Sequence, residues 1–258
     1  MRKWKNRCRV WWEEAKGEEK STAQKMLLLL SVVILGFCLV YQGPAAYEAW
    51  SIGGEKDTSK QDSAPLVRLE SNLGEKQLVL TFDCEGKGNH TDEILGILKT
   101  NNVPAVFFVT GTWLDENKKE AGKIVDAGYE IGGHGVTHKD LSEADEKTCR
   151  EELKQMDEKI KRVTGQNMRL YRPAYNSYNE ALEKCAADSG VTLVLYSLDT
   201  QDWKNYGADE LVEEVCQSDN LEDGAILWCH LNGKYTAQCL EPMIGKLEEK
   251  GYRFNAIP

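Results

Sequence analysis

The sequence predicts an α/β fold in which short, mostly buried strands alternate with helices around a parallel sheet. Apolar runs of strand length recur from Leu66 onward, and amphipathic stretches of helical length lie between them. The chain of 258 residues is long enough to bury a full core, and 41% of its residues are hydrophobic. Such alternation is typical of βα units, arranged either as an open doubly wound sheet or as a barrel.

Each expected element is a run of one periodicity bounded by turn residues. Strands are expected at residues 77–82, 104–109, 129–133, 168–172, 192–197 and 225–229, with a weaker one at 252–257. Helices are expected around 91–100, 113–127, 142–163, 178–188, 208–217 and 237–250. Polar residues cluster just after several strand ends, which is where both architectures place their sites.

The N-terminal part has the features of a membrane anchor. Residues 1–25 carry a net charge of +4, and residues 26–42, "MLLLLSVVILGFCLVYQ", are uncharged and close to a bilayer-spanning length. The positive-inside rule places the basic leader in the cytoplasm. We therefore expect a single-pass membrane protein with a linker at 43–65 and an extracellular catalytic domain at 66–258. The alternatives are a cleaved signal peptide, which gives a secreted protein, and a buried core helix.

Charge and cysteine content restrict the partners. The whole chain has a net charge of −10, so the part after residue 25 carries −14, and this acidic balance argues against nucleic-acid binding. Six of the eight cysteines follow the anchor, where disulfides can persist. No two of them have the spacing of a zinc knuckle, so buried thiols or structural disulfides are expected.

The stretch "GGHGVTH" is a candidate metal site. His134 and His138 are four residues apart directly after a strand, a spacing that lets two imidazoles face one ion. A zinc protease helix requires a glutamate after the first histidine, whereas Gly135 stands there. The flanking glycines favour a loop.

Other strand ends carry polar residues that can do chemistry. Asp83 ends "LVLTFD", and Arg172 in "YRPAYN" could orient a carboxylate through its bidentate guanidinium. His230 ends "ILWCH", although a lone histidine on an apolar strand is more often a packed residue. In "SLDTQDW", Asp199 and Asp202 taken alone resemble helix-capping residues.

Together these stretches resemble a known family. In chain order, "TFD", "HGVTH", "RPAY", "DTQDW" and the histidine of "WCH" resemble the five motifs of the polysaccharide deacetylases, the carbohydrate esterases with a NodB homology domain. The resemblance extends over roughly residues 75–254. It implies a distorted (β/α)7 barrel and the metal-dependent hydrolysis of N-acetyl groups.

The resemblance also implies catalytic and metal-binding roles. Asp83 matches the general base and Arg172 the residue that orients it. His134 and His138 match the two metal-binding imidazoles, and His230 matches the general acid. An acetamide requires a polarised carbonyl, an activated water and a proton for the leaving amine. A divalent ion with an acid–base pair supplies these requirements.

Three further residues match the substrate-binding and tuning positions of the family. The backbone near Tyr175 is similar to the turn that binds the oxyanion, and Trp203 matches the wall of the acetyl pocket. Asp202 matches the residue that tunes the acidic histidine, and Asp199 is a further candidate for that role.

Cys84 departs from the family pattern, in which an aspartate completes an Asp-His-His metal triad. Three arrangements are open: a Cys84 thiolate ligand that favours zinc, a weaker site of two histidines and waters, or a Cys84–Cys229 disulfide. Glu85 could replace the missing carboxylate, although neighbouring residues of a strand point to opposite faces. Trp228, where the family commonly has an aliphatic residue, is expected to alter the acetyl pocket.

The sequence thus predicts a membrane-anchored N-deacetylase of cell-wall polysaccharide, most simply of peptidoglycan GlcNAc or MurNAc. Its expected cofactor is zinc, with cobalt or manganese as alternatives. The hypothesis from another class is a non-catalytic glycan-binding protein whose metal site is degraded.

Overall fold

The structure is a computed structural model that describes residues 64–70, 74–87, 90–204 and 206–258. All of the described residues lie within one compact unit, Lys60–Pro258. The predicted leader, the predicted anchor at 26–42 and nearly all of the predicted linker lie outside the described residues. Among the residues that are described, no helix combines the length and apolar character needed to cross a membrane.

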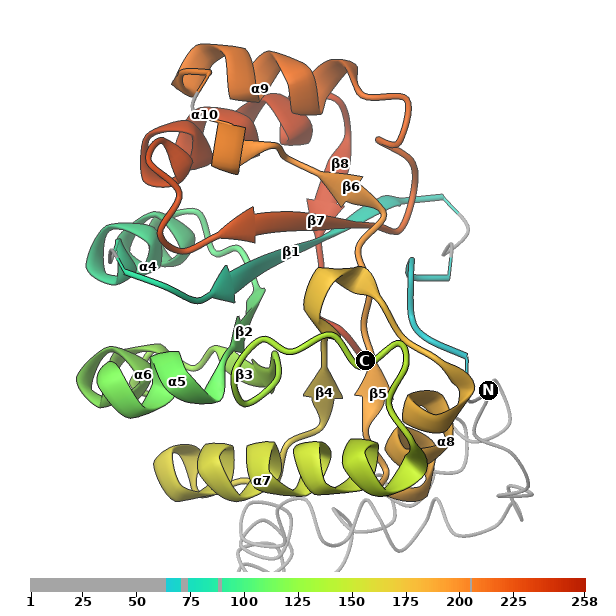
Figure 1. Ribbon diagram of the computed structural model, residues 1–258. Helices are drawn as coiled ribbons and strands as arrows, with labels where there is room; N and C mark the ends of the chain where they lie inside the picture. Colours follow the sequence, from blue (N-terminus) through green and yellow to red (C-terminus); the bar gives the residue numbers. More distant parts are fainter. Residues whose placement is uncertain (1–63, 71–73, 88–89, 205) are drawn as a thin grey trace, which may run out of the picture. The chain divides into compact units, whose positions relative to one another are not determined.

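Strands and helices alternate along the described chain, much as the sequence predicts (Figure 1). The strands are β1 (Lys76–Cys84), β2 (Ala105–Val109), β3 (Glu130–Gly133), β4 (Leu170–Tyr171), β5 (Thr192–Leu193), β6 (Leu198–Asp199), β7 (Ala225–His230) and β8 (Tyr252–Phe254). The helices are α4 (Thr91–Thr100), α5 (Gly111–Glu116), α6 (Lys118–Asp126), α7 (Glu146–Thr164), α8 (Glu180–Asp188), α9 (Ala208–Gln217) and α10 (Thr236–Glu249). Two short 3-10 turns are η1 (Ala174–Asn176) and η2 (Asp202–Lys204).

The strands form one parallel sheet in the order β5-β4-β3-β2-β1-β7-β6, and β8 pairs with the start of β1. Figure 1 shows the sheet curling, with the helices on its outer side. The α/β fold with parallel strands is therefore confirmed. The expected (β/α)7 barrel is present as a curled half-barrel, because no ladder joins β5 to β6 within the described part of the chain.

The barrel stays open between β5 and β6 because the chain segment that connects these two strands is short. Only residues 194–197 separate these strands, whereas adjacent parallel strands need a crossover of a dozen or more residues. The chain instead passes from one edge of the sheet to the other. Val194 N still donates to Tyr171 O of β4 (2.9 Å), while Ser197 N donates to Ile226 O of β7 (3.1 Å). The strand expected at 192–197 is therefore confirmed only at its start, as β5 (Thr192–Leu193) with a bridge at Val194.

Side chains of the sheet alternate between two apolar cores. The inner core lies within the curled sheet and includes Val79, Val106, Phe108 and Ile226. The outer core lies between the sheet and the helices and takes the intervening residues of the same strands. Because side chains of a strand alternate in this way, the position of a polar residue in its strand determines whether it points to the inner or the outer face of the sheet.

Two helix predictions change at their ends. The helix expected at 113–127 is divided into α5 and α6 at Asn117, which ends one helix and begins the other. The helix expected from Ser142 begins only at Glu146, because Asp145 caps it by accepting from Thr148 N at 2.8 Å. Asn179 caps α8, since its side chain accepts from Leu182 N at 2.9 Å.

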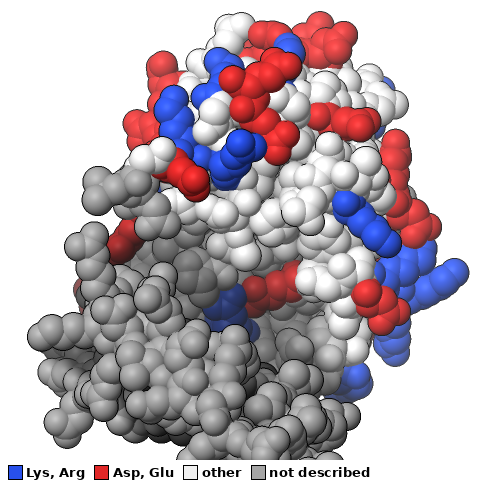
Figure 2. Space-filling model, turned by 180° about the vertical axis from the view of Figure 1, so that it is seen from behind, with Lys and Arg blue, Asp and Glu red and all other residues white. Residues whose placement is uncertain are grey.

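Charged side chains lie mainly on the surface. On the face shown in Figure 2, Lys and Arg side chains are interspersed with Asp and Glu side chains. Surface pairs such as Arg169–Glu130, at 2.8 Å, contribute roughly 0–1 kcal/mol each. The stability of the fold therefore depends mainly on the two apolar cores.

Candidate active site

The predicted functional residues converge because their strands are neighbours in the sheet. Asp83 of β1 pairs in register with His230 of β7, and Gly133 of β3 pairs with Tyr171 of β4. His134 and Arg172 directly follow that second pair. The carboxyl ends of these strands open into a cavity of about 440 Å³, which Asp83, His134, His138, Arg172, Tyr175, Trp203 and His230 help to line.

Asp83 and Arg172 form a buried ion pair in the wall of this cavity. Arg172 Nη1 donates to Asp83 Oδ1 at 2.7 Å, and both side chains are almost completely buried. Arg172 Nη2 donates to Thr81 Oγ1 at 2.9 Å, and the guanidinium lies 4.2 Å from the centre of the Phe108 ring. The arginine is thus fixed from three sides and orients the carboxylate, as the sequence predicts.

The charges around Asp83 keep it ionised. Burial, the largest single influence, raises the pKa of this carboxyl. The charges of His134, Arg172 and His230 act against burial, and the hydrogen bond from Arg172 adds to their effect. The resulting pKa is below the ordinary value of an aspartate, so the group is a carboxylate at neutral pH.

His134 is held in a defined orientation. A Cβ on Gly132 would lie 2.7 Å from the Phe108 ring, so the "GG" pair lets β3 approach its neighbours closely before the histidine. His134 Nδ1 lies 2.8 Å from Arg172 O, an acceptor, which requires the proton on Nδ1. His134 Nε2 faces the cavity, 3.1 Å from His138 Nε2 and 3.2 Å from Asp83 Oδ2.

The loop after His134 brings His138 back beside it. Gly135 has a φ of 79°, and its carbonyl accepts from Gly111 N at 2.9 Å. Val136 N donates to Glu152 Oε1 of α7 at 2.6 Å. The two histidine Nε2 atoms lie 3.1 Å apart. The segment that carries both histidines is a loop and not a helical turn. Burial, then the charge of His134, lowers the pKa of His138, which favours the neutral form that binds metals.

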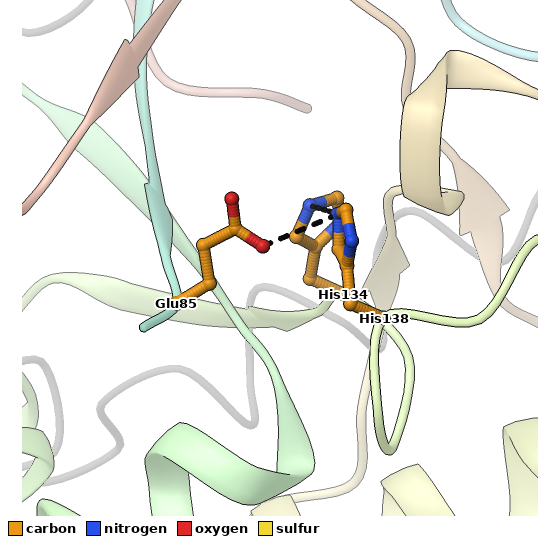
Figure 3. A group of neighbouring side chains, drawn as sticks. All are labelled: Glu85, His134 and His138. Carbon is orange, nitrogen blue, oxygen red and sulfur yellow. Dashed lines mark hydrogen bonds and ion pairs between the residues drawn. The ribbon is translucent and has the colours of Figure 1, made fainter. Parts of the chain in front are cut away.

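The carboxylate of Glu85 completes a candidate metal site with the two histidines. One ligand atom from each of Glu85, His134 and His138 lies within 4.8 Å of the others, and Glu85 Oε2 is 3.3 Å from His138 Nε2 (Figure 3). Two imidazoles and one carboxylate form a common ligand set of catalytic zinc sites. The residues present therefore fit a divalent ion.

The structure does not bring Cys84 to this site. Cys84 follows Asp83 on β1, so its side chain points to the opposite face, where it is fully buried in the outer core. Burial raises the pKa of the Cys84 thiol well above its ordinary value, so it is no thiolate ligand. Cys84 and Cys229 are both free thiols, as are the other four described cysteines. Glu85, two residues from Asp83, shares its face and takes the position expected for Cys84.

His230 and Asp202 form the second charged pair of the site. Asp202 Oδ1 accepts from His230 Nδ1 at 2.7 Å, and Asp202 Oδ2 accepts from His230 N at 2.7 Å and from Thr236 Oγ1 at 2.6 Å. Burial lowers the pKa of His230, but Asp202 outweighs burial and raises that pKa above its ordinary value. His230 therefore retains its proton more strongly than a free histidine, as an acid requires.

The remaining predicted residues lie around the mouth of the cavity. Tyr175, in the left-handed region with a φ of 58°, is exposed, and its ring packs 4.6 Å from that of His138. Trp203 is also exposed and lines the cavity. Asp199 does not contribute to the lining. Its carboxylate accepts from Gln201 N at 2.7 Å and from Trp203 Nε1 at 3.4 Å, so it holds the loop rather than His230.

Two aromatic residues contribute more than the sequence indicates. Trp228 donates from Nε1 to Asp83 Oδ2 at 2.5 Å, and its ring stacks on that of Tyr196 at 4.3 Å. Both line the cavity. The alternation of β7 places Trp228 on the same face as His230, which is a signal available in the sequence. The contact with Tyr196 depends on the unexpected chain crossing at 194–197.

Comparisons with known proteins agree with this geometry. A family model described as "Polysaccharide deacetylase" matches residues 70–194. A chitooligosaccharide deacetylase from Rhizobium leguminosarum bv. phaseoli is 33% identical over 163 residues, which cover 62% of this chain and 70% of that protein. The chain belongs to the polysaccharide deacetylase family. The resemblance inferred from the five motifs is thus confirmed, as is the expectation of a deacetylase hydrolase.

Solved structures of this family share the fold. The peptidoglycan-N-acetylmuramic acid deacetylase PdaA of Bacillus subtilis is 29% identical over 213 residues, covering 78% of this chain and 79% of that protein. Its structure gives a TM-score of 0.68. A pseudoenzyme of carbohydrate esterase family 4 from Bacillus anthracis is 33% identical with a TM-score of 0.69, over 74% of this chain and 66% of that chain. A mutant described as having restored enzymatic activity is also similar.

Substituting Glu85 and Cys84 separately distinguishes the two candidate ligands. Glu85→Gln is expected to weaken Zn²⁺ binding by at least about ten-fold. Loss of a residue that only orients a metal ligand already lowers metal affinity by about that factor, and loss of a ligand itself should lower it at least as much. Cys84→Ala should leave the affinity unchanged, since the thiol lies in the outer core. Calorimetric titration of the metal-free protein measures both affinities. A loss of affinity in Cys84→Ala alone would contradict the Glu85 site.

Proposed function

We propose that this protein is a metal-dependent N-deacetylase of cell-wall polysaccharide, with peptidoglycan as its substrate. The observation that carries the proposal is the pair of oppositely tuned groups in one cavity. Asp83 has a lowered pKa and His230 a raised one, the combination that a general base and a general acid require. The relatives described as peptidoglycan deacetylases support the choice of substrate.

Each group has a defined task in this proposal. A divalent ion held by Glu85, His134 and His138 would polarise the acetamide carbonyl and activate a water. Asp83, oriented by Arg172, accepts the proton of the attacking water at Oδ2. His230 donates its proton to the departing amine nitrogen and is then reprotonated from bulk water. The backbone near Tyr175 faces the oxygen that becomes negative.

Acetate release tests the proposal directly. The purified protein is stripped with a chelator, supplied with Zn²⁺, Co²⁺ or Mn²⁺ in parallel, and incubated with N-acetylated peptidoglycan fragments. We expect metal-dependent acetate release that falls by about 10²–10⁴-fold in His230→Ala, because the amine leaves poorly without an acid. Glycan binding without acetate release under every metal would support the non-catalytic alternative. Equal activity in His230→Ala would show that the acid is another group.

The pH profile tests the coupling between Asp202 and His230. Asp202 raises the pKa of His230, so Asp202→Asn should lower it and deprotonate the acid at lower pH. The alkaline limb of kcat/KM is therefore expected to move toward lower pH. A profile that keeps its shape while thermal stability decreases would assign Asp202 a structural role only.

The location outside the cytoplasm rests on the charge and hydropathy of residues 1–42. We propose that residues 26–42 anchor the protein, which would bring the catalytic domain to the cell wall. Expression with and without residues 1–42 checks this, and only the longer protein should sediment with membranes. If both forms remain in the soluble fraction, the anchor is wrong, whereas the catalytic proposal is unaffected.

A further inference from the structure

The indole of Trp228 lies against the catalytic carboxylate. Alternation along β7 places Ile226, Trp228 and His230 on the inner face of the sheet, and Ile226 belongs to the inner core. The neighbouring β1 pairs Thr81 with Trp228 in register. From this position Trp228 Nε1 reaches Asp83 Oδ2 at 2.5 Å.

The two oxygens of Asp83 thus have different donors. Arg172 Nη1 holds Oδ1 at 2.7 Å, while Trp228 Nε1 holds Oδ2. One donor on each oxygen prevents the carboxylate from rotating about its Cβ–Cγ bond. A carboxylate oxygen has two acceptor directions, so Oδ2 retains one beside the indole. His134 Nε2, 3.2 Å from Oδ2, marks the side on which the metal site lies.

The indole is itself rigidly held. It stacks on Tyr196 with ring centres 4.3 Å apart and an interplanar angle of 7°. On its other side the His230 ring lies at 4.5 Å, tilted by 56°. Tyr196 stands on the four-residue crossing that spans the opening of the half-barrel. The aromatic pair therefore connects the edge of the sheet to both members of the acid–base pair.

We propose that Trp228 is a positioning residue for the base, and that its indole N–H holds Asp83 Oδ2 in the orientation that accepts the proton of the attacking water. The inference rests on the proposed deacetylase function. It gives Trp228 a role beyond shaping the acetyl pocket, because its polar atom contacts the base. The apolar ring and the N–H then have separable effects on substrate binding and on the rate.

Replacing Trp228 by 3-benzothienylalanine separates these effects, because sulfur takes the place of the N–H while the ring keeps its shape. We expect kcat for acetate release to fall by about ten- to a hundred-fold, the range for a hydrogen bond to a charged group. KM should stay about the same, since the wall of the cavity is preserved. Zn²⁺ affinity, measured by calorimetry, should also stay unchanged, since Trp228 is not a ligand. Trp228→Phe should lower kcat and also raise KM.

Trp113 offers a matched control. It is a buried tryptophan of α5 in the outer core, outside the cavity lining. The same replacement at Trp113 should leave kcat and KM unchanged. As a second readout, the indole N–H resonance of Trp228 should shift in Asp83→Ala, whereas that of Trp113 should not.

The outcomes separate this inference from the function on which it rests. Unchanged or increased kcat with benzothienylalanine at Trp228, in a protein whose unmodified form releases acetate, overturns the positioning role alone. An equal loss at Trp113 also overturns it, because the effect would then be a general one of the replacement. If the unmodified protein releases no acetate with any metal, the proposed function and the inference fail together.

Discussion

The buried Asp83–Arg172 pair determines the geometry of the whole site. Its guanidinium fixes the base at 2.7 Å, and the main-chain carbonyl of the same arginine fixes the tautomer of His134 at 2.8 Å. One residue therefore orients both the proposed base and an imidazole of the candidate metal site. Removing either partner of such a pair leaves an uncompensated buried charge, at a cost of about 3–5 kcal/mol. The base cannot be relocated without disturbing the metal site.

His230, the proposed general acid, is also held by a buried partner of opposite charge, Asp202, but on other elements of the fold. Asp202 receives three donors, two of them from His230 and one from Thr236 of α10. A Cβ on Gly233 would lie 3.0 Å from Asp202 Oδ2 and would also collide with Thr236, so the turn after β7 requires a glycine. The two halves meet through Trp228, which contacts Asp83 and packs against His230. Asp83 and His230 are thus each held by a buried partner of opposite charge, Arg172 and Asp202 respectively.

The sequence predicted the position of a side chain well where that position follows from alternation along a strand. It predicted less where the position depends on how the chain crosses between β5 and β6. Asp83, His134, Arg172 and His230 could be predicted because each stands at a strand end. Cys84 and Glu85 could have been distinguished by counting from Asp83, since only even steps stay on its face. The end of β5 at Leu193 and the crossing of residues 194–197 to the opposite edge of the sheet depend on tertiary pairing. The stacking of Tyr196 on Trp228 follows from that crossing, so no local pattern indicates it.

Burial energetics favour an enzyme over a glycan-binding protein that kept an old scaffold. A buried ion pair is often no more stabilising than well-packed apolar residues of similar volume. A protein that only binds glycan would gain from exposed aromatic residues such as Tyr175 and Trp203, and would lose nothing by replacing Asp83 and Arg172. Here both buried charged pairs are complete, and the carboxylate that Cys84 cannot provide is supplied by Glu85. The departure at Cys84 is therefore compensated in the candidate metal site, as continued catalysis would require.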